Sequence, residues 1–180
     1  STAIDRIKDF LIKPININNL IEELTENNYV LMTFHPVTNS NENIALLMEY
    51  SIIKLLSLNL KVLITYPNND VGVEKIIEVI NKFSDNNRVI IKKNLGAEGY
   101  YSAIYNSKFV IGNSSSGVIE VPYFNKISIN VGNRQEGRDT DSNVWNCKTD
   151  KTNLDSIFEK GKLIKWKSSR TEGLYGEGNS

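Results

Sequence analysis

Three adjacent serines, Ser114, Ser115 and Ser116, stand between an apolar segment and a helix-like segment in the sequence GNSSSG (112–117). Backbone N–H groups at the start of a helix bind anions, and serine hydroxyls add further donors. The flanking glycines allow the backbone to approach a ligand closely, so Ser114 and Ser115 are candidates for a phosphate site. Serine is also a common helix N-cap, and Ser115 or Ser116 would fill that role without any ligand. Local chemistry leaves both alternatives open.

Charged residues follow the serines at positions that suit hydroxyl and phosphate groups. Glu120 lies one helical turn past Ser116, and a carboxylate can accept hydrogen bonds from both hydroxyls of a diol such as ribose. The alternative is an acidic residue that complements the helix dipole. Arg134 and Arg138 lie four residues apart after the next apolar run, and the forked guanidinium matches phosphate oxygens. The alternative for each arginine is a surface ion pair.

His35 is the only histidine of the chain, and it ends an apolar run directly before Pro36. A single histidine is most often structural, but an imidazole at the end of a strand favours a contact with a phosphate or sugar oxygen. One histidine and one cysteine do not build a zinc site. The turn sequence YPNND (66–70) either caps the helix after it or lines a pocket with Asn68.

The composition excludes several classes of protein. Lys and Arg together number 21, as do Asp and Glu, so the net charge is zero and nothing provides the basic field that a nucleic-acid partner needs. The single cysteine precludes an intrachain disulfide and indicates a reducing compartment, the cytoplasm. No apolar run approaches the roughly 18 residues of a membrane span, so no membrane partner is expected, and no motif indicates a metal or cofactor.

Short apolar runs alternate with helical patterns along the chain. Continuous apolar runs predict buried strands, and apolar residues spaced three or four apart predict amphipathic helices. The segment before residue 29 predicts a lead-in helix, a loop and a short helix. Strands are predicted at 29–36, 60–67, 88–93, 109–113, 127–131 and 143–147, and helices at 44–55, 73–83, 99–107, 116–124 and 154–161, the last stopped by a glycine.

This alternation predicts an α/β fold, a Rossmann-like three-layer domain with a parallel sheet covered on both faces. Residues 1–180 are read as a single domain, because no linker or repeat interrupts them. In open parallel sheets, ligands bind beyond the carboxyl ends of the strands. The serines, His35, Asn68 and Arg134 all follow predicted strands, so we expect them to gather at that edge.

Five motifs occur in order along the chain: FHPVT (34–38), TYPNND (65–70), GNSSSGVIEVPYF (112–124), SINVGNRQEGR (128–138) and YGEGNS (175–180). Together they resemble the UDP-N-acetylglucosamine 2-epimerases, in particular the hydrolysing branch that opens sialic and legionaminic acid synthesis. The resemblance implies two Rossmann-like halves, as in the GT-B glycosyltransferases, of which this chain looks like the C-terminal, UDP-binding half, with the N-terminal half absent.

The resemblance also implies roles for individual residues around a UDP-sugar substrate. Ser116 is then left as the helix cap, and His35 is the one catalytic candidate, near the diphosphate and the reacting sugar. Acid and base carboxylates would lie in the N-terminal half, so the isolated domain is expected to be inactive. The predicted substrate-binding residues are Asn68 in the pocket, Asn94 in the uracil-binding loop 93–96, Ser114 and Ser115 on the phosphates, Glu120 on the ribose, and Arg134 and Arg138 at the diphosphate.

The resemblance implies release of UDP together with N-acetylmannosamine or a diacetamido-trideoxy analogue, and a possible homo-oligomer of the full-length enzyme. Two other functions fit the same residues. One is the donor-nucleotide-binding half of a GT-B glycosyltransferase, which also uses a ribose-binding acid and a phosphate loop. The other is a non-catalytic nucleotide-sugar-binding module.

Overall fold

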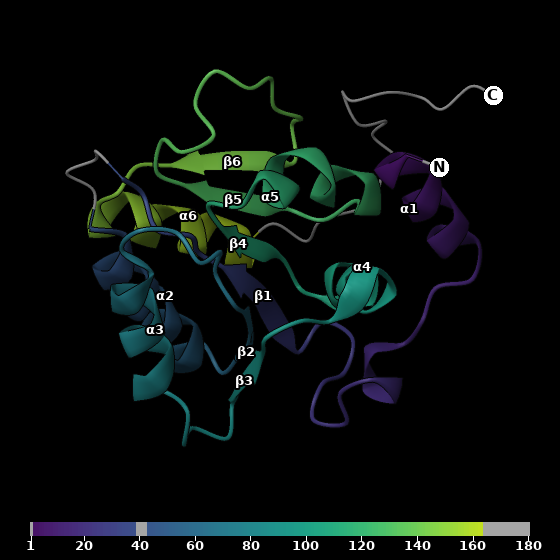
Figure 1. The fold of residues 1–180 in the computed structure, drawn as a ribbon, viewed down its shortest axis with the longest axis horizontal. Helices are drawn as coiled ribbons and strands as arrows, with labels where there is room; N and C mark the ends of the chain where they lie inside the picture. The colour runs from purple at the N-terminus through teal and green to yellow at the C-terminus, as the bar shows by residue number, and fades with distance from the viewer. Residues whose placement is uncertain (1, 39–42, 164–180) are drawn as a thin grey trace.

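The computed structural model describes residues 2–38 and 43–163, and these form a six-stranded, fully parallel sheet in the order β3-β2-β1-β4-β5-β6. Helices flank the sheet on both faces (Figure 1). The predicted α/β class and three-layer architecture are therefore confirmed. The strands are β1 (Tyr29–Thr33), β2 (Lys61–Thr65), β3 (Val89–Lys92), β4 (Val110–Gly112), β5 (Ser128–Val131) and β6 (Val144–Cys147). The helices are α1 (Ala3–Ile12), α2 (Ile44–Ser57), α3 (Val73–Lys82), α4 (Gly96–Asn106), α5 (Ser115–Ile119) and α6 (Lys151–Leu163), with 3₁₀ turns η1 (Ile17–Asn19) and η2 (Val121–Phe124).

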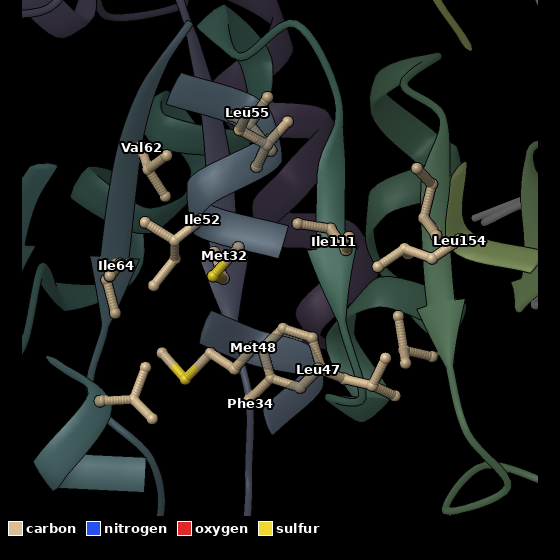
Figure 2. Close-up of a cluster of buried hydrophobic side chains, with 14 of the residues drawn as sticks. Met32, Phe34, Leu47, Met48, Ile52, Leu55, Val62, Ile64, Ile111 and Leu154 are labelled. Carbon is tan, nitrogen blue, oxygen red and sulfur yellow. The ribbon is translucent and has the colours of Figure 1, made fainter. Parts of the chain in front are cut away.

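Two hydrophobic cores lie on opposite faces of the sheet, because successive side chains of each strand alternate between them. In β1 and just beyond it, Met32 and Phe34 join the core beneath α2, α3 and α6, whereas Leu31 joins the core beneath α1, α4 and η2. Figure 2 shows the first core, where Met48 and Ile52 of α2 lie over the strands. Because both faces of β1 are buried, its sequence is apolar up to the last residue, Thr33.

The boundaries of several elements differ from the sequence prediction. The predicted helix 116–124 is in fact α5 followed by η2, because Pro122 cannot supply the backbone N–H that would continue an α-helix. Helix α4 begins at Gly96, three residues before the predicted start. Helix α6 runs past Gly161, the predicted stop, to Leu163, since one glycine costs a helix only about 1 kcal/mol. The YGEGNS motif lies outside the described residues.

The point where the strand order reverses lies between β1 and β4. The chain builds β2 and β3 on one side of β1, then returns to place β4, β5 and β6 on the other side. Asn113, which is fully buried, follows β4 and bridges this point. Its Oδ1 accepts a hydrogen bond from the His35 N–H at 2.7 Å, and its Nδ2 donates to the His35 carbonyl at 2.9 Å. The carboxyl ends of two central strands are thereby held together by one amide.

Gly112 is required where β4 passes β1. It pairs with Thr33 in the parallel ladder and has a φ of +154°. A Cβ at this position would lie 1.9 Å from the Thr33 carbonyl oxygen, which is backbone and cannot move aside. Only glycine allows this approach, which brings the Asn113 side chain to the end of β1. Within the described residues, no helix has both the length and the apolar character needed to cross a bilayer.

We expect Gly112→Ala to lower the free energy of unfolding by about 3 kcal/mol or more, because strain in φ and the backbone clash add together. Gly137→Ala is the matched control: its φ of +85° is also positive, but nothing lies within 4 Å of its Cβ position. The control should lose about 1 kcal/mol. Urea unfolding of both variants measures the difference, and equal losses would contradict the proposed contact with Thr33.

Candidate functional site

A groove of about 350 Å³ opens beyond the carboxyl ends of β2 and β3, between α4 and the end of α5. It brings together two of the predicted binding residues, Asn94 and Glu120. Glu120 is the acidic residue among those that form the walls. The lining residues are Arg6, Thr65, Lys93, Asn94, Leu95, Gly96, Ala97, Tyr100, Tyr101 and Glu120.

The loop after β3 forms one wall of this groove. The Asn94 side chain folds back on the loop, where its Oδ1 accepts a hydrogen bond from the Gly96 N–H at 2.8 Å. This local bond shapes the turn into α4 and is typical of asparagine. The Lys93 ammonium lies 5.4 Å from the centre of the Tyr66 ring, a cation–π distance. The loop therefore has a defined shape before any ligand is bound.

The three serines have different structural roles from those predicted. Helix α5 begins at Ser115, and Ser114 is its N-cap, with an Oγ that accepts from the Ser116 N–H at 3.4 Å. The prediction that Ser115 or Ser116 caps the helix is therefore wrong. Ser114 takes this role because its backbone is extended, with φ −74° and ψ 145°, as an N-cap requires. Helix α5 has only five residues, so its dipole is small.

Ser116 instead takes part in a hydrogen-bond chain that ends on Glu120. The Tyr100 hydroxyl donates to Ser116 Oγ at 2.8 Å, and Ser116 Oγ donates to Glu120 Oε2 at 2.8 Å. Burial raises the pKa of Tyr100 to about 12, so its hydroxyl keeps its proton at neutral pH. Tyr100 packs against the core beneath α1 and α4 and also lines the groove beside Glu120.

His35 lies at the end of β1 as predicted, and only 7% of it is exposed. Its Nδ1 accepts a hydrogen bond from the Asn68 backbone N–H at 2.9 Å. Burial and the nearby Arg134 guanidinium lower the pKa of His35 to about 4, against a smaller opposing effect of Asp70. The imidazole is thus neutral at pH 7, and because Nδ1 is an acceptor, the proton lies on Nε2. His35 can donate one hydrogen bond but carries no charge.

The loop after β5 is hydrogen-bonded to Asn113, the residue that also holds the backbone of His35. Arg134 Nη1 and Gln135 Nε2 each donate to the Asn113 carbonyl, both at 3.1 Å. Arg134 is half-buried, whereas Arg138 is exposed and is not part of the groove lining. Gln135 Oε1 is buried and finds no hydrogen-bond partner among the described residues. Asn113 and Gln135 were not among the predicted site residues, although both stand inside the motifs GNSSSGVIEVPYF and SINVGNRQEGR.

The predicted residues therefore form two sets on either side of α5. Asn94 and Glu120 line the groove, while His35, Asn68 and Arg134 connect to Asn113 or to one another. Helix α5 links the sets because Asn113 precedes it by two residues and Glu120 follows it directly. In the part of the chain that the structure describes, no three His, Cys, Asp or Glu side chains gather as a metal site would require.

Comparison with known sequences places this arrangement in a family context. The sequence matches the UDP-N-acetylglucosamine 2-epimerase family over residues 1–180. It is 37% identical over 114 residues to the UDP-N,N'-diacetylbacillosamine 2-epimerase (hydrolyzing) of Legionella pneumophila, covering 63% of this chain and 30% of that protein. It is 31% identical to the GDP/UDP-N,N'-diacetylbacillosamine 2-epimerase (hydrolyzing) of Campylobacter jejuni, covering 89% and 42%. The chain thus spans less than half of these relatives.

Solved structures share the fold. The S. aureus MnaA–UDP complex superposes with a TM-score of 0.74 at 17% identity, over 98% of this chain and 48% of that one. The E. coli heptosyltransferase WaaC with ADP gives a TM-score of 0.60 at 12% identity, over 86% and 48%, so the domain resembles half of a GT-B-like structure. The match over residues 1–180 decides the family, and the chain belongs to the UDP-N-acetylglucosamine 2-epimerase family.

Proposed function

We propose that this chain is the UDP-binding domain of a hydrolysing UDP-N-acetylglucosamine 2-epimerase. The observation that carries the proposal is the position of α5, which has Glu120 and the groove at one end and the Asn113–His35–Arg134 cluster at the other. Such a pair of sites suits a nucleoside diphosphate, whose nucleoside and phosphates need different surroundings. The cluster lies where the strand order reverses, as expected for ligands of open α/β sheets.

In this proposal, UDP extends along α5. The uracil contacts backbone groups of loop 93–96, and the ribose hydroxyls donate to the Glu120 carboxylate. Ser115 and Arg134 bind the diphosphate, Ser114 adds its hydroxyl proton while it caps α5, and Arg138 approaches from the exposed end of its loop. Arg134 has five N–H donors, one of which reaches the Asn113 carbonyl, so others serve phosphate oxygens.

The reaction proposed from the family starts with loss of UDP and of the proton on sugar C2, followed by addition of water to the glycal-like intermediate. Negative charge develops on the departing diphosphate, where fixed donors lower the barrier most. This chain supplies those donors. The neutral Nε2–H of His35 adds a hydrogen bond to the diphosphate or the sugar. Glu120, the acid of the groove lining, is assigned to the ribose, so the acid and base groups are assigned to the part of the enzyme outside this chain.

The sugar of the substrate is proposed to be N-acetylglucosamine or a diacetamido-trideoxy relative. Both kinds appear among similar proteins: the Legionella and Campylobacter relatives are named for diacetylbacillosamine, and a Neisseria meningitidis relative, 30% identical, is named a UDP-N-acetylglucosamine 2-epimerase. The sugar would lie at the edge of the described surface, beyond the phosphates. The UDP part of the substrate is common to both.

The 180-residue chain should bind UDP more tightly than UMP, and UMP more tightly than uridine, because each phosphate adds charge-assisted hydrogen bonds. Calorimetry or NMR titration gives the three affinities. The same preparation should release no free sugar from UDP-N-acetylglucosamine. Equal affinity for UDP and uridine would refute the phosphate site, and measurable sugar release would refute the assignment of acids and bases elsewhere.

Ser115→Ala and Arg134→Ala should each weaken UDP binding by about 1–3 kcal/mol while leaving uridine binding unchanged, because each removes a hydrogen bond to a charged phosphate. Ser114→Ala is the comparison within the same loop. It removes both the N-cap and a proposed phosphate donor, so it should lower stability by about 1 kcal/mol and also weaken UDP binding, whereas Ser115→Ala should weaken UDP binding alone. Thermal unfolding and UDP titration of all three variants separate the two effects. If Ser115→Ala lowered stability and left UDP affinity intact, Ser115 would have a structural role only.

His35 should make stability depend on pH in a defined window. Its pKa is about 4 in the folded protein, against about 6.5 when unfolded. Between these values the unfolded chain binds a proton that the folded chain does not, so stability is full above pH 6.5 and falls toward pH 4. The loss should reach up to about 3 kcal/mol relative to His35→Gln, which does not titrate. If the free energy of unfolding changed equally with pH in wild type and His35→Gln, a buried, neutral His35 would be contradicted.

A further inference from the structure

We propose that Tyr100 and Ser116 are positioning residues that hold Glu120 for a ribose diol, so that the site selects ribonucleotides over 2′-deoxyribonucleotides. This inference rests on the proposed nucleotide function and goes further, because it names what sets sugar specificity. Tyr100 and Ser116 act through Glu120, the group that would touch the ligand. Tyr100 comes from α4 and Ser116 from α5, so the arrangement also ties the two helices that border the groove.

Chemistry fixes the direction of every proton in this chain of hydrogen bonds. An ionised carboxylate only accepts, so the single hydroxyl proton of Ser116 must point to Glu120 Oε2, 2.8 Å away. Ser116 Oγ then has only lone pairs to offer to Tyr100, whose hydroxyl must donate at 2.8 Å. The hydroxyl of Tyr100 retains its proton because burial holds its pKa at about 12. The chain therefore has one polarity, from Tyr100 to Glu120.

This polarity separates the tasks of the neighbouring serines. Because the only proton of Ser116 is committed to Glu120, Ser116 has none left to donate to a phosphate oxygen. Ser115 is the preceding residue and lies half-buried at the first turn of α5. Its hydroxyl proton is not directed to Glu120, so it can be donated to a phosphate oxygen. The hydroxyl of Ser116 therefore serves the nucleoside end of the site and not the phosphate end.

The hydrogen bond from Ser116 leaves Glu120 suited to a diol. A carboxylate has about four lone-pair positions, and this bond occupies one of them while it restricts the rotation of a flexible side chain. The remaining positions can accept from two neighbouring hydroxyl groups at once. Ribose offers two such donors and 2′-deoxyribose offers one, so a held carboxylate discriminates between them, whereas a free one adjusts to either.

The test compares binding of UDP and 2′-deoxy-UDP by calorimetry. The wild-type chain should prefer UDP by about 10- to 100-fold, the effect expected for one hydrogen bond to a charged group. Tyr100→Phe and Ser116→Ala should each reduce this preference several-fold, mainly by weakening UDP, because 2′-deoxy-UDP gains less from a fixed carboxylate. Tyr105→Phe is the matched control: it makes the same substitution on the same helix, at a residue that does not line the groove, and should keep the wild-type preference.

Thermal unfolding of the same variants distinguishes a positioning role from a structural one. If Tyr100→Phe and Ser116→Ala lower the melting temperature yet keep the wild-type preference for UDP, the two residues only join α4 to α5, and the proposal is overturned. If the wild-type chain binds UDP no better than uridine, the proposed function is overturned, and so is this inference, which rests on it. If UDP binds more tightly than uridine, but both variants keep the wild-type preference for UDP over 2′-deoxy-UDP, only this inference is overturned.

Discussion

The side chain of Asn113 connects the carboxyl ends of β1 and β4, and the surroundings of the candidate phosphate site depend on that connection. Its side-chain amide forms two hydrogen bonds with the backbone of His35, a residue 78 positions away. Its backbone carbonyl accepts hydrogen bonds from the side chains of Arg134 and Gln135. Asn113 itself is out of contact with water, since it is 0% exposed. A buried amide with both ends satisfied stabilises one arrangement strongly, because any rearrangement leaves polar groups unpaired.

The close approach that makes this bridge possible has its own requirement in the backbone. Asn113 reaches β1 only because Gly112 passes within contact of the Thr33 carbonyl, where no side chain fits. Once the bridge is made, the next residue, Ser114, begins the cap of α5. Successive residues of GNSSSG therefore have different roles. Gly112 allows the close approach to β1, Asn113 forms the bridge, Ser114 caps α5, and Ser115 places a hydroxyl at the first turn of that helix. Ser116, the next residue, directs its hydroxyl proton to Glu120.

The sequence predicted the inner strands β1, β2 and β4 well because they are largely buried on both faces, which favours a continuous apolar run. It failed on the serines for a physical reason. The position of an N-cap depends on where the helix begins, and a shift of one residue, which local patterns cannot resolve, transfers the role from Ser115 to Ser114. Asn113 was missed because an asparagine after a strand ordinarily indicates a turn. The hydrogen bond of Tyr100 to Ser116 was not predicted, because a helical pattern does not reveal where a side-chain hydroxyl finds its partner.

The electrostatics of the described surface suit a leaving group better than a proton acceptor. A neutral His35 beside the Arg134 guanidinium offers donors and one positive charge, which would stabilise a departing diphosphate. A carboxylate base set next to that diphosphate would be repelled by it and would have its pKa raised. Placing the acids and bases on a different, facing surface avoids this conflict. Under the proposed function, a division of the site between two domains follows from charge, since the group that receives the C2 proton and the group that holds the departing anion are best kept apart until a sugar lies between them.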